Sequence, residues 1–380
     1  MAKYIKLWLI AALVLSAAVY SYASGPAESG SVTLSGLFPD RALRREVAKS
    51  LGRRQANLTG EALLNSLASI QGSRLNRWEA FLASFDGHMR REGSMFIELR
   101  EGQPVFNVSG KGIRNAGGIE YLTGVTQLMI HDNQLTALDV SQNTALTHLY
   151  TGGNLLTSLN VSGAAALEYI QVVDSSLTTL DVSNNRVLTW LSLYNTGRTA
   201  YNSQITSLDI SHNTALTHLW LQNNLLTGLD VSNNTALTWL RVDNNRLISL
   251  NVSNNTRLQS LDVTGNRLTA LNVSNNGALG RLLAGDNQLT TLNVQNNTAL
   301  AILHVDGNRL TNLILNTGSN NRLVNLRVED NQLTSLDIRH TRLQNLNVSG
   351  NSNLTTIYIR GSTLRPAAIT NRPVGLVIER

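Results

Sequence analysis

The side chains of this chain that could support acid–base or metal chemistry are few and widely separated. The sequence has 380 residues, with seven histidines and no cysteine. Most of the histidines lie far apart, at positions that include His131, His148, His212, His218 and His304. They lack the close spacing of a metal site, and no serine and carboxylate accompany them in triad-like order. We therefore expect isolated surface histidines, no metal, no cofactor and no enzymatic activity.

A column of acidic and amide residues recurs at a regular interval and is a second candidate site. Its members are Asp139, Asn160, Asp181, Asp209, Asp230, Asn251, Asn272 and Asn293. Carboxylates that stack about 4.8 Å apart repel each other, and a cation such as calcium could relieve that repulsion. The asparagines in the same column already reduce it. Calcium binding is therefore an alternative, and we expect no metal.

Aromatic residues make up only 5% of the chain, and a group of them shares one spacing with an arginine. The group consists of His148, Tyr150, Tyr169, Trp190, Tyr194, His218, Trp220, Trp239 and Arg241. Aromatic side chains and arginine offer rigid contact area with a polar end, which recognition surfaces favour. These residues are predicted to form a binding strip for a protein or glycan ligand. The alternative is that aromatic side chains on exposed strand positions only stabilise a sheet.

A repeat of 21 residues, which begins near Val125, positions these side chains. Each unit contains two near-copies of the phrase Leu-x-x-Leu-x-Leu-x-x-Asn. One leucine of the phrase recurs at positions 146, 167, 188, 216, 237, 258, 279, 300 and 323. A period of 20 to 29 residues built on this phrase is typical of leucine-rich solenoids, whose units bury their apolar side only by stacking. The sequence therefore predicts a solenoid of leucine-rich repeats with about ten coils.

Each coil is predicted to hold two short parallel strands, because half a unit is too short to circle a packed interior. In one unit, Leu219-Trp220-Leu221 belongs to the first strand and Leu229-Asp230-Val231 to the second. Stacked coils then form two ribbons, ribbon A and ribbon B, with leucine between them. Because side chains alternate along a strand, the aromatic group should point outward from ribbon A. Asparagines at the turns, such as Asn224 and Asn245, should form a ladder that satisfies backbone groups.

One irregularity lies beside the predicted binding strip. The leucine spacing grows from 21 to 28 residues between Leu188 and Leu216. The segment from Asn195 to Gln204 is therefore predicted to bulge from its coil as a loop. Such a loop could extend the strip, and an insertion without function is an equal alternative.

Residues 1–23 are predicted to be a signal peptide. Lys3 and Lys6 precede an apolar run of 13 residues, and the small residues Ser21 and Ala23 suit cleavage. A membrane anchor is the alternative, but the run is shorter than the roughly 20 residues that span a bilayer. The absence of cysteine excludes a lipoprotein anchor and disulfides. We expect a secreted or extracytoplasmic product, in the periplasm or at the cell surface, with no integral membrane segment after signal removal.

The net charge of +6 does not point to nucleic acid. From residue 116 to the end, acidic and basic residues balance at 16 each, so the excess lies nearer the N-terminus. A nucleic-acid-binding solenoid would carry a basic stripe along its repeats. The predicted partner is therefore a protein or glycan. We also expect the chain to be a monomer.

Residues 24–115 lack the repeat and are predicted to form an N-terminal cap. Leu43, Val47 and Leu51 make one apolar stripe of a short helix that follows Phe38-Pro39-Asp40 and ends at Gly52. Two more helices are expected near 63–70 and 75–82, and then a hairpin over 95–108. The cap should cover the apolar end of the first coil of the solenoid at 116–364. Residues 365–380 should form a C-terminal cap segment.

The repeat phrases carry a family resemblance. Residues 229–238, 107–113 and 118–122 resemble the nested 21-residue repeats of exported bacterial leucine-rich-repeat proteins, the IRREKO type, which is similar to internalin-like surface proteins. Many relatives have cysteine in the first strand, where this chain has residues such as Val242. The family cap often has a calcium loop, but the matching stretch here, Arg53–Asn57, contains no carboxylate that could bind calcium. The resemblance covers about two thirds of the chain. It implies a secreted or surface binding protein with no reaction; the rival function is a structural spacer.

Overall fold

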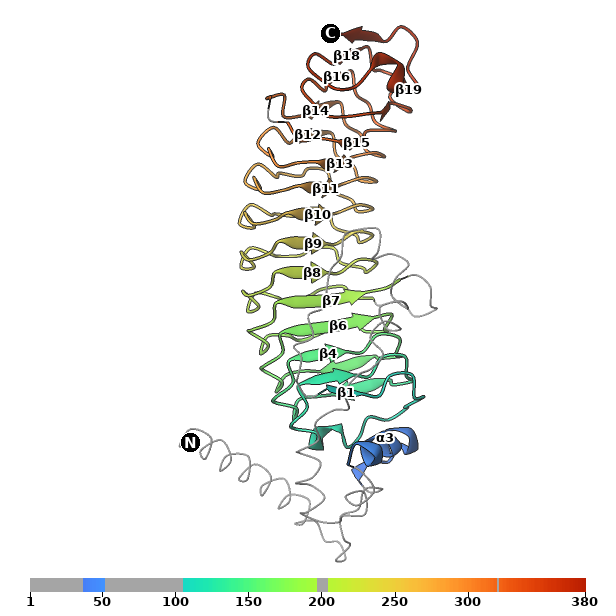
Figure 1. Ribbon diagram of the computed structural model, residues 1–380, viewed down its shortest axis with the longest axis vertical. Coiled ribbons are helices and arrows are strands. Elements are labelled where there is room, and N and C mark those ends of the chain that lie inside the picture. Colours follow the sequence, from blue (N-terminus) through green and yellow to red (C-terminus); the bar gives the residue numbers. More distant parts are fainter. Residues whose placement is uncertain (1–36, 52–104, 197–203, 320) are drawn as a thin grey trace, which may run out of the picture.

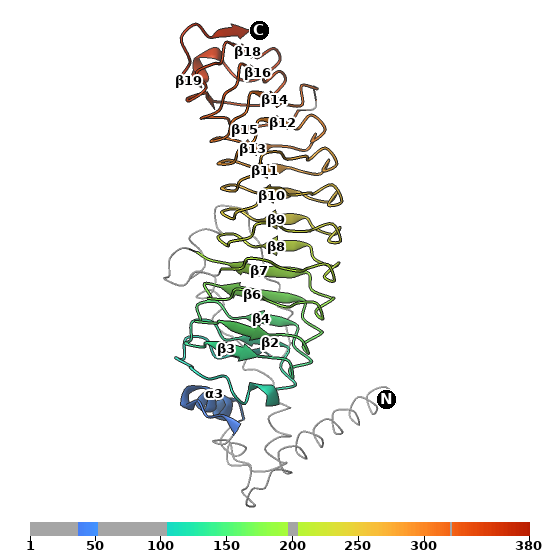
Figure 2. The same cartoon turned by 180° about the vertical axis from the view of Figure 1, so that it is seen from behind.

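The computed structural model describes residues 37–51, 105–196, 204–319 and 321–380, and these form a rod of stacked coils (Figures 1 and 2). Helix α3 (Arg41–Leu51) lies at one end of the rod and the C-terminal strands lie at the other. The predicted signal peptide, the helices near 63–70 and 75–82 and the first half of the hairpin fall outside the described residues. None of the described helices has the length and hydropathy needed to cross a membrane.

Ribbon A is a continuous parallel sheet of 11 strands, each one coil away from the next. Its strands are β1 (Val105–Asn107), β2 (Gln127–Met129), β4 (His148–Tyr150), β6 (Tyr169–Val173), β7 (Trp190–Tyr194), β8 (His218–Trp220), β9 (Trp239–Arg241), β10 (Ser260–Asp262), β11 (Arg281–Leu283), β13 (Ile302–His304) and β15 (Asn325–Arg327). Two further strands, β17 (Leu346–Asn347) and β19 (Ile369–Thr370), pair with each other in the last coils. The solenoid has about 13 turns, more than the ten that the sequence predicts.

Ribbon B has strands only near the two ends of the rod. They are β3 (Ala137–Asp139), β5 (Ser158–Asn160), β12 (Thr291–Asn293), β14 (Asn312–Ile314), β16 (Ser335–Asp337), β18 (Thr356–Tyr358) and β20 (Val377–Glu379). In the described coils between β5 and β12 the second half of each unit forms no strand, although Leu180, Leu250 and Leu271 remain buried there. The prediction of two strands per coil is therefore wrong for these middle coils. Their leucines fill the core without requiring backbone pairing on that side.

A single apolar core runs the length of the rod between the two sides. Leu219, Leu240 and Leu261 lie opposite one another on consecutive strands of ribbon A, and all three have no exposed surface. Because each leucine packs against its copies in the coils before and after, no coil buries its core alone. The predicted leucine-rich solenoid is confirmed.

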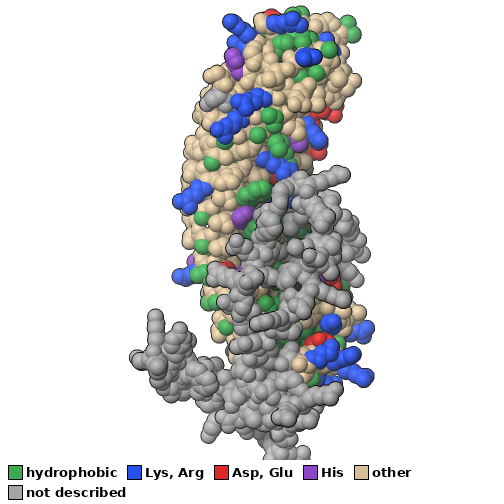
Figure 3. Space-filling model, in the orientation of Figure 1, with side chains coloured by type: hydrophobic (Ala, Val, Ile, Leu, Met, Phe, Trp, Pro, Cys, Tyr) green, Lys and Arg blue, Asp and Glu red, His purple; other side chains and the backbone are tan. Residues whose placement is uncertain are grey.

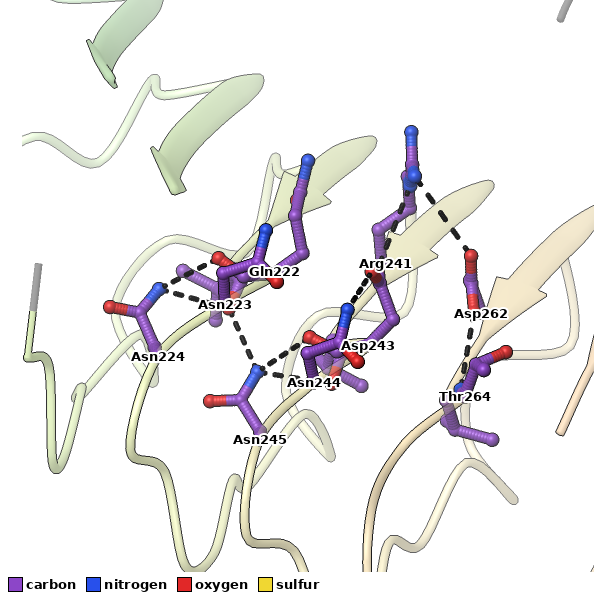
Figure 4. Close-up of polar contacts among 12 residues, drawn as sticks. Gln222, Asn223, Asn224, Arg241, Asp243, Asn244, Asn245, Asp262 and Thr264 are labelled. Atoms are coloured by element: carbon purple, nitrogen blue, oxygen red, sulfur yellow. Dashed lines mark hydrogen bonds and ion pairs between the residues drawn. The ribbon is translucent and has the colours of Figure 1, made fainter. Parts of the chain in front are cut away.

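The predicted asparagine ladder is confirmed at the turns that follow ribbon A, as Figure 4 shows for two coils. The Oδ1 atom of Asn245 accepts the backbone N–H of Leu226 at 3.0 Å. Its Nδ2 group donates to the carbonyls of Leu221 at 2.9 Å and Val242 at 3.0 Å. One buried amide thus satisfies backbone groups in its own coil and in the preceding coil.

A second ladder follows ribbon B and was not predicted. Its members are Asn143, Asn185, Asn213, Asn234, Asn255, Asn276 and Asn297. The Nδ2 group of Asn234 donates to the carbonyls of Ile210 at 3.0 Å and Asn213 at 2.9 Å, while its buried Oδ1 atom has no hydrogen-bond partner. Ala164 occupies the equivalent position in one coil. The second ladder therefore tolerates the loss of its amide in at least that coil.

Helix α3 is joined to the solenoid by Asp40. One carboxylate oxygen accepts the N–H groups of Ala42 at 2.8 Å and Leu43 at 3.0 Å, which caps the helix. The other accepts the N–H of Arg114 at 2.8 Å. Burial alone would raise the pKa of Asp40, but these backbone hydrogen bonds lower it overall. With Leu43 and Val47 fully buried, the predicted helix is confirmed.

Strand β1 lies within the segment predicted to be cap, yet it pairs in parallel with β2 as the first strand of ribbon A. The described half of the predicted hairpin therefore belongs to the solenoid sheet. The sheet begins at Val105, before the predicted solenoid boundary at residue 116.

The two ladders predict different costs for the same substitution. Asn245→Ala removes partners from buried backbone groups in two coils, so we expect a loss of about 2–4 kcal/mol in the free energy of unfolding. Asn234→Ala also removes an Oδ1 atom that has no partner, so its cost should be less than half as large. Urea unfolding followed by circular dichroism would measure both. Equal losses would contradict the distinction between the ladders.

Candidate ligand-binding face

All nine residues of the predicted binding strip lie on five consecutive strands of ribbon A. They occupy β4, β6, β7, β8 and β9: His148, Tyr150, Tyr169, Trp190, Tyr194, His218, Trp220, Trp239 and Arg241. They alternate with leucines and isoleucine that point into the core, such as Leu149 and Leu219. Residues one coil apart in the sequence therefore lie side by side on the outer face of the sheet.

Five of these side chains form a continuous stack, which we call the aromatic ladder. The parallel register places His148 beside Tyr169, Tyr169 beside Trp190, and so on through His218 to Trp239. Successive ring centroids lie 5.7, 5.4, 4.3 and 6.2 Å apart, and the planes of neighbouring rings differ by 15 to 24°. Rings at these distances attract each other. The aromatic ladder runs along the axis of the rod.

A second column of outward residues supports the aromatic ladder from one side. Tyr150 contacts Tyr169 with ring centroids 5.0 Å apart, and Trp220 contacts Trp190 at the same distance with the planes tilted by 59°. The guanidinium of Arg241 lies 5.5 Å from the centre of the Trp220 ring, within the range of a cation–π contact.

Four of the nine residues are buried, which corrects the prediction that the whole strip is outward and accessible. Tyr150, Tyr169, Tyr194 and Trp220 are 1%, 8%, 8% and 4% exposed. They belong to two apolar clusters outside the main core, which also contain Met129 and Val173. The remaining five are half-buried: His148, Trp190, His218, Trp239 and Arg241. An outward position on a strand does not guarantee exposure when its neighbours are large rings.

Burial shifts the pKa of several titratable rings on this face. Burial raises the pKa of Tyr194 to about 12, and it also raises the pKa of Tyr150 and Tyr169. Burial lowers the pKa of His218 from 6.5 to about 4. The phenols of these three tyrosines and the imidazole of His218 are therefore neutral at pH 7, and their contacts are those of apolar and dipolar groups.

Charged residues border the second column. Arg241 lies 3.8 Å from a carboxylate oxygen of Asp243 and 3.9 Å from one of Asp262, as Figure 4 shows. Each distance is near the upper limit for an ion pair, so these contacts constrain the guanidinium less than a direct hydrogen bond would. On the visible face in Figure 3, basic side chains are spaced along the rod and form no single stripe.

The N-terminal end of the predicted loop is hydrogen-bonded to neighbouring coils. Asp174 accepts the backbone N–H of Thr196 at 2.7 Å and its hydroxyl at 2.8 Å. Asn195 and Asn223 exchange side-chain to backbone hydrogen bonds of 3.1 and 2.6 Å. Because Asn195 directly follows β7, the loop starts beside the strip. Residues 197–203 lie outside the described residues, so a role for the loop in binding stays a prediction.

The acidic column and a hollow on the ribbon B side are weaker candidates for a ligand-binding site. In the acidic column, each of Asp181, Asp209 and Asp230 accepts the N–H of a serine two residues later, and hydrogen bonds to that serine lower the pKa of all three. Among the described residues, no three His, Cys, Asp or Glu side chains form a group that could hold a metal. A hollow of about 250 Å³ lies on the ribbon B side and is lined by small polar and apolar residues between 270 and 296.

The lowered pKa of His218 predicts a pH-dependent stability. Between pH 6.5 and about 4 the unfolded chain binds more protons than the folded chain, so stability falls as pH falls through this window. Since the ring is only half-buried, we expect a loss of about 1–2 kcal/mol. Urea unfolding at pH 7 and pH 4.5 would measure it, with His218→Phe as the variant that keeps a stacked ring. The same pH dependence in both proteins would refute the assignment to His218.

Comparison with known proteins gives matches only among solved structures. No protein-family model matches the sequence, and no curated protein matches it. The internalin InlF from Listeria monocytogenes is similar, with 20% identity, 93% of this chain and 98% of that chain covered, and a TM-score of 0.54. The leucine-rich repeat domain of APL1B is 19% identical over 79% of this chain and 96% of that chain, with a TM-score of 0.50.

The functional domain of InlJ from Listeria monocytogenes, described as including a cysteine ladder, is 26% identical over 90% of this chain and 78% of that chain, with a TM-score of 0.41. At these identities the likeness concerns the fold, and the predicted resemblance is confirmed at that level. This chain is therefore a leucine-rich-repeat protein whose solenoid has the fold of the internalins.

Proposed function

We propose that this protein is a secreted or surface-associated binding protein, and that its ligand, a protein or a glycan, contacts the outward face of ribbon A. The aromatic ladder carries this proposal. Five rings lie in register on consecutive strands, and four of them, on His148, Trp190, His218 and Trp239, keep part of their surface exposed. Exposed tryptophan in a group is typical of recognition surfaces.

Ribbon B provides an internal comparison. The outward positions of strands β3, β5, β12 and β14 hold no aromatic residue, and Ala137, Ser158 and Thr291 among them are exposed. These strands still pair from coil to coil, so coil stacking does not require tryptophan at outward positions. The difference between the two faces favours a function for ribbon A other than stability.

The rival function is a structural spacer in which the rings only stabilise the sheet. The buried Tyr150, Tyr169 and Trp220 are compatible with that role, because their contacts are with other residues of the chain. Trp190 and Trp239 differ from these rings because part of each side chain remains accessible to a ligand. Export of the chain, which either function requires, is supported by the predicted signal peptide at residues 1–23.

Replacing the two half-exposed tryptophans should separate the two functions. The full chain would be screened against a glycan array and a displayed peptide library, and the ligands found would be titrated against Trp190→Ala/Trp239→Ala. Loss of hot-spot tryptophans should weaken binding by about 30-fold or more. A matched control on ribbon B, Thr291→Ala, should bind normally.

Circular dichroism would verify that both variants remain folded. Ligands that bind equally well to the tryptophan variant and to the native chain would contradict a binding site on ribbon A. The absence of any ligand in both screens would favour the spacer.

A further inference from the structure

The inner rings of the aromatic ladder present their edges, and not their faces, to a ligand. Neighbouring planes are within 24° of parallel, and the stack runs along the rod, so the faces of Tyr169, Trp190 and His218 look toward the next ring. Sugars commonly pack on ring faces, and these faces are already in contact with one another. Ring edges carry the positive part of the aromatic quadrupole. They suit apolar side chains and the oxygen atoms of carbonyls and carboxylates.

Two arginines and a histidine, which we call the basic cluster, continue the same face beyond the aromatic ladder. The arginines carry its positive charge, because the pKa of His304 is lowered, and Asp262 lies on strand β10 between the two regions. Arg281 on β11, His304 on β13 and Arg327 on β15 occupy outward positions, and Arg327 is exposed. Burial is the main cause that lowers the pKa of His304, and the positive charges of Arg327 and Arg281 lower it further. The three side chains are therefore close enough to interact electrostatically. Asp306 and the hydrogen bond to Asn325 act in the opposite direction on that histidine.

The two regions are separated by a distance that one extended segment can span. Four strand steps lead from β9, which holds Trp239, through β10, β11 and β13 to β15, which holds Arg327. At about 4.8 Å per step this is roughly 19 Å, the length of about six residues of extended chain. A segment lying parallel to the rod axis would reach both.

This inference rests on the proposed function. We propose that the ligand is a protein with an extended acidic segment. Its apolar side chains contact the edges of the aromatic ladder, and an aspartate or glutamate about six residues away lies over Arg327, with Arg281 between the two regions. Charge complementarity orients the segment along the rod. The aromatic ladder supplies apolar contact area, and the basic cluster supplies direction and specificity.

The experiment uses a display library of random 16-residue peptides selected on the full chain. Enriched peptides should carry apolar or aromatic residues separated by five to seven positions from Asp or Glu. Arg327→Glu should weaken the best synthetic peptide at least tenfold, and changing its acidic residues to lysine should restore part of the binding to that variant. The exposed Arg246, which lies in a turn outside ribbon A, gives the control Arg246→Glu, and binding should be unchanged.

The outcomes separate this inference from the proposed function. Peptides that depend on Trp190 and Trp239 but not on Arg327 would overturn the acidic segment and leave the binding face standing. Peptides that depend on neither would contradict both. Binding of cellohexaose or chitohexaose that is lost in Trp239→Ala, without enrichment of acidic peptides, would overturn the protein ligand in favour of a glycan.

Discussion

The in-register pairing of ribbon A is the constraint on which the rest of the structure depends. Each strand of that sheet hydrogen-bonds to the strand one coil away, so Leu240 lies opposite Leu219 on one side and Leu261 on the other. A change of one residue in register would exchange inward and outward side chains over a whole strand. The length of the coil is therefore fixed by the sheet, and even the 28-residue unit between Leu188 and Leu216 returns to the same pairing.

The same constraint turns a repeated sequence position into a column in space. Inside the rod this produces the leucine core and the two asparagine ladders, in which each amide bonds to its own coil or to the previous one. On the outer face of ribbon A, the same pairing places aromatic side chains of successive coils at stacking distance. Trp190 and His218 are 28 residues apart in the sequence and have ring centroids 4.3 Å apart. A single aromatic substitution per coil is enough to lengthen such a stack by one ring.

Much of this architecture could be predicted from the sequence, because a period of 21 with leucine at fixed positions has few structural solutions. The strands of ribbon A, the leucine core, the first asparagine ladder and the helix after Asp40 follow from periodicity and capping residues. The gathering of the nine candidate residues on one ribbon also follows from it. The burial of Tyr150, Tyr169, Tyr194 and Trp220 does not follow, because alternation along a strand gives direction and says nothing about how far large neighbours cover one another.

Two other features escaped prediction for related reasons. Repeated asparagines after ribbon B, such as Asn234 and Asn255, are visible in the sequence, but the repeat phrase alone does not distinguish a buried amide from one that faces solvent. The middle coils form no ribbon B strands although they repeat the same phrase, so the phrase does not determine whether a strand forms on that side. Since ribbon A already holds the coils together, ribbon B can be irregular there without loss of the core.

A solenoid of this kind separates stability from recognition more completely than a globular domain does. Core positions and turn asparagines are copied from coil to coil, and any departure at those positions breaks contacts in two neighbouring coils. Outward positions contact the core little, so they can diverge one coil at a time. On ribbon B most are small or polar, with exceptions such as Ile314 and Tyr358 toward the C-terminal end, whereas on ribbon A they change from aromatic residues on β4–β9 to the basic cluster on β11–β15. Only an elongated ligand can contact both the aromatic ladder and the basic cluster, because they lie at different positions along the rod. This is the physical reason to look for an extended partner on this face.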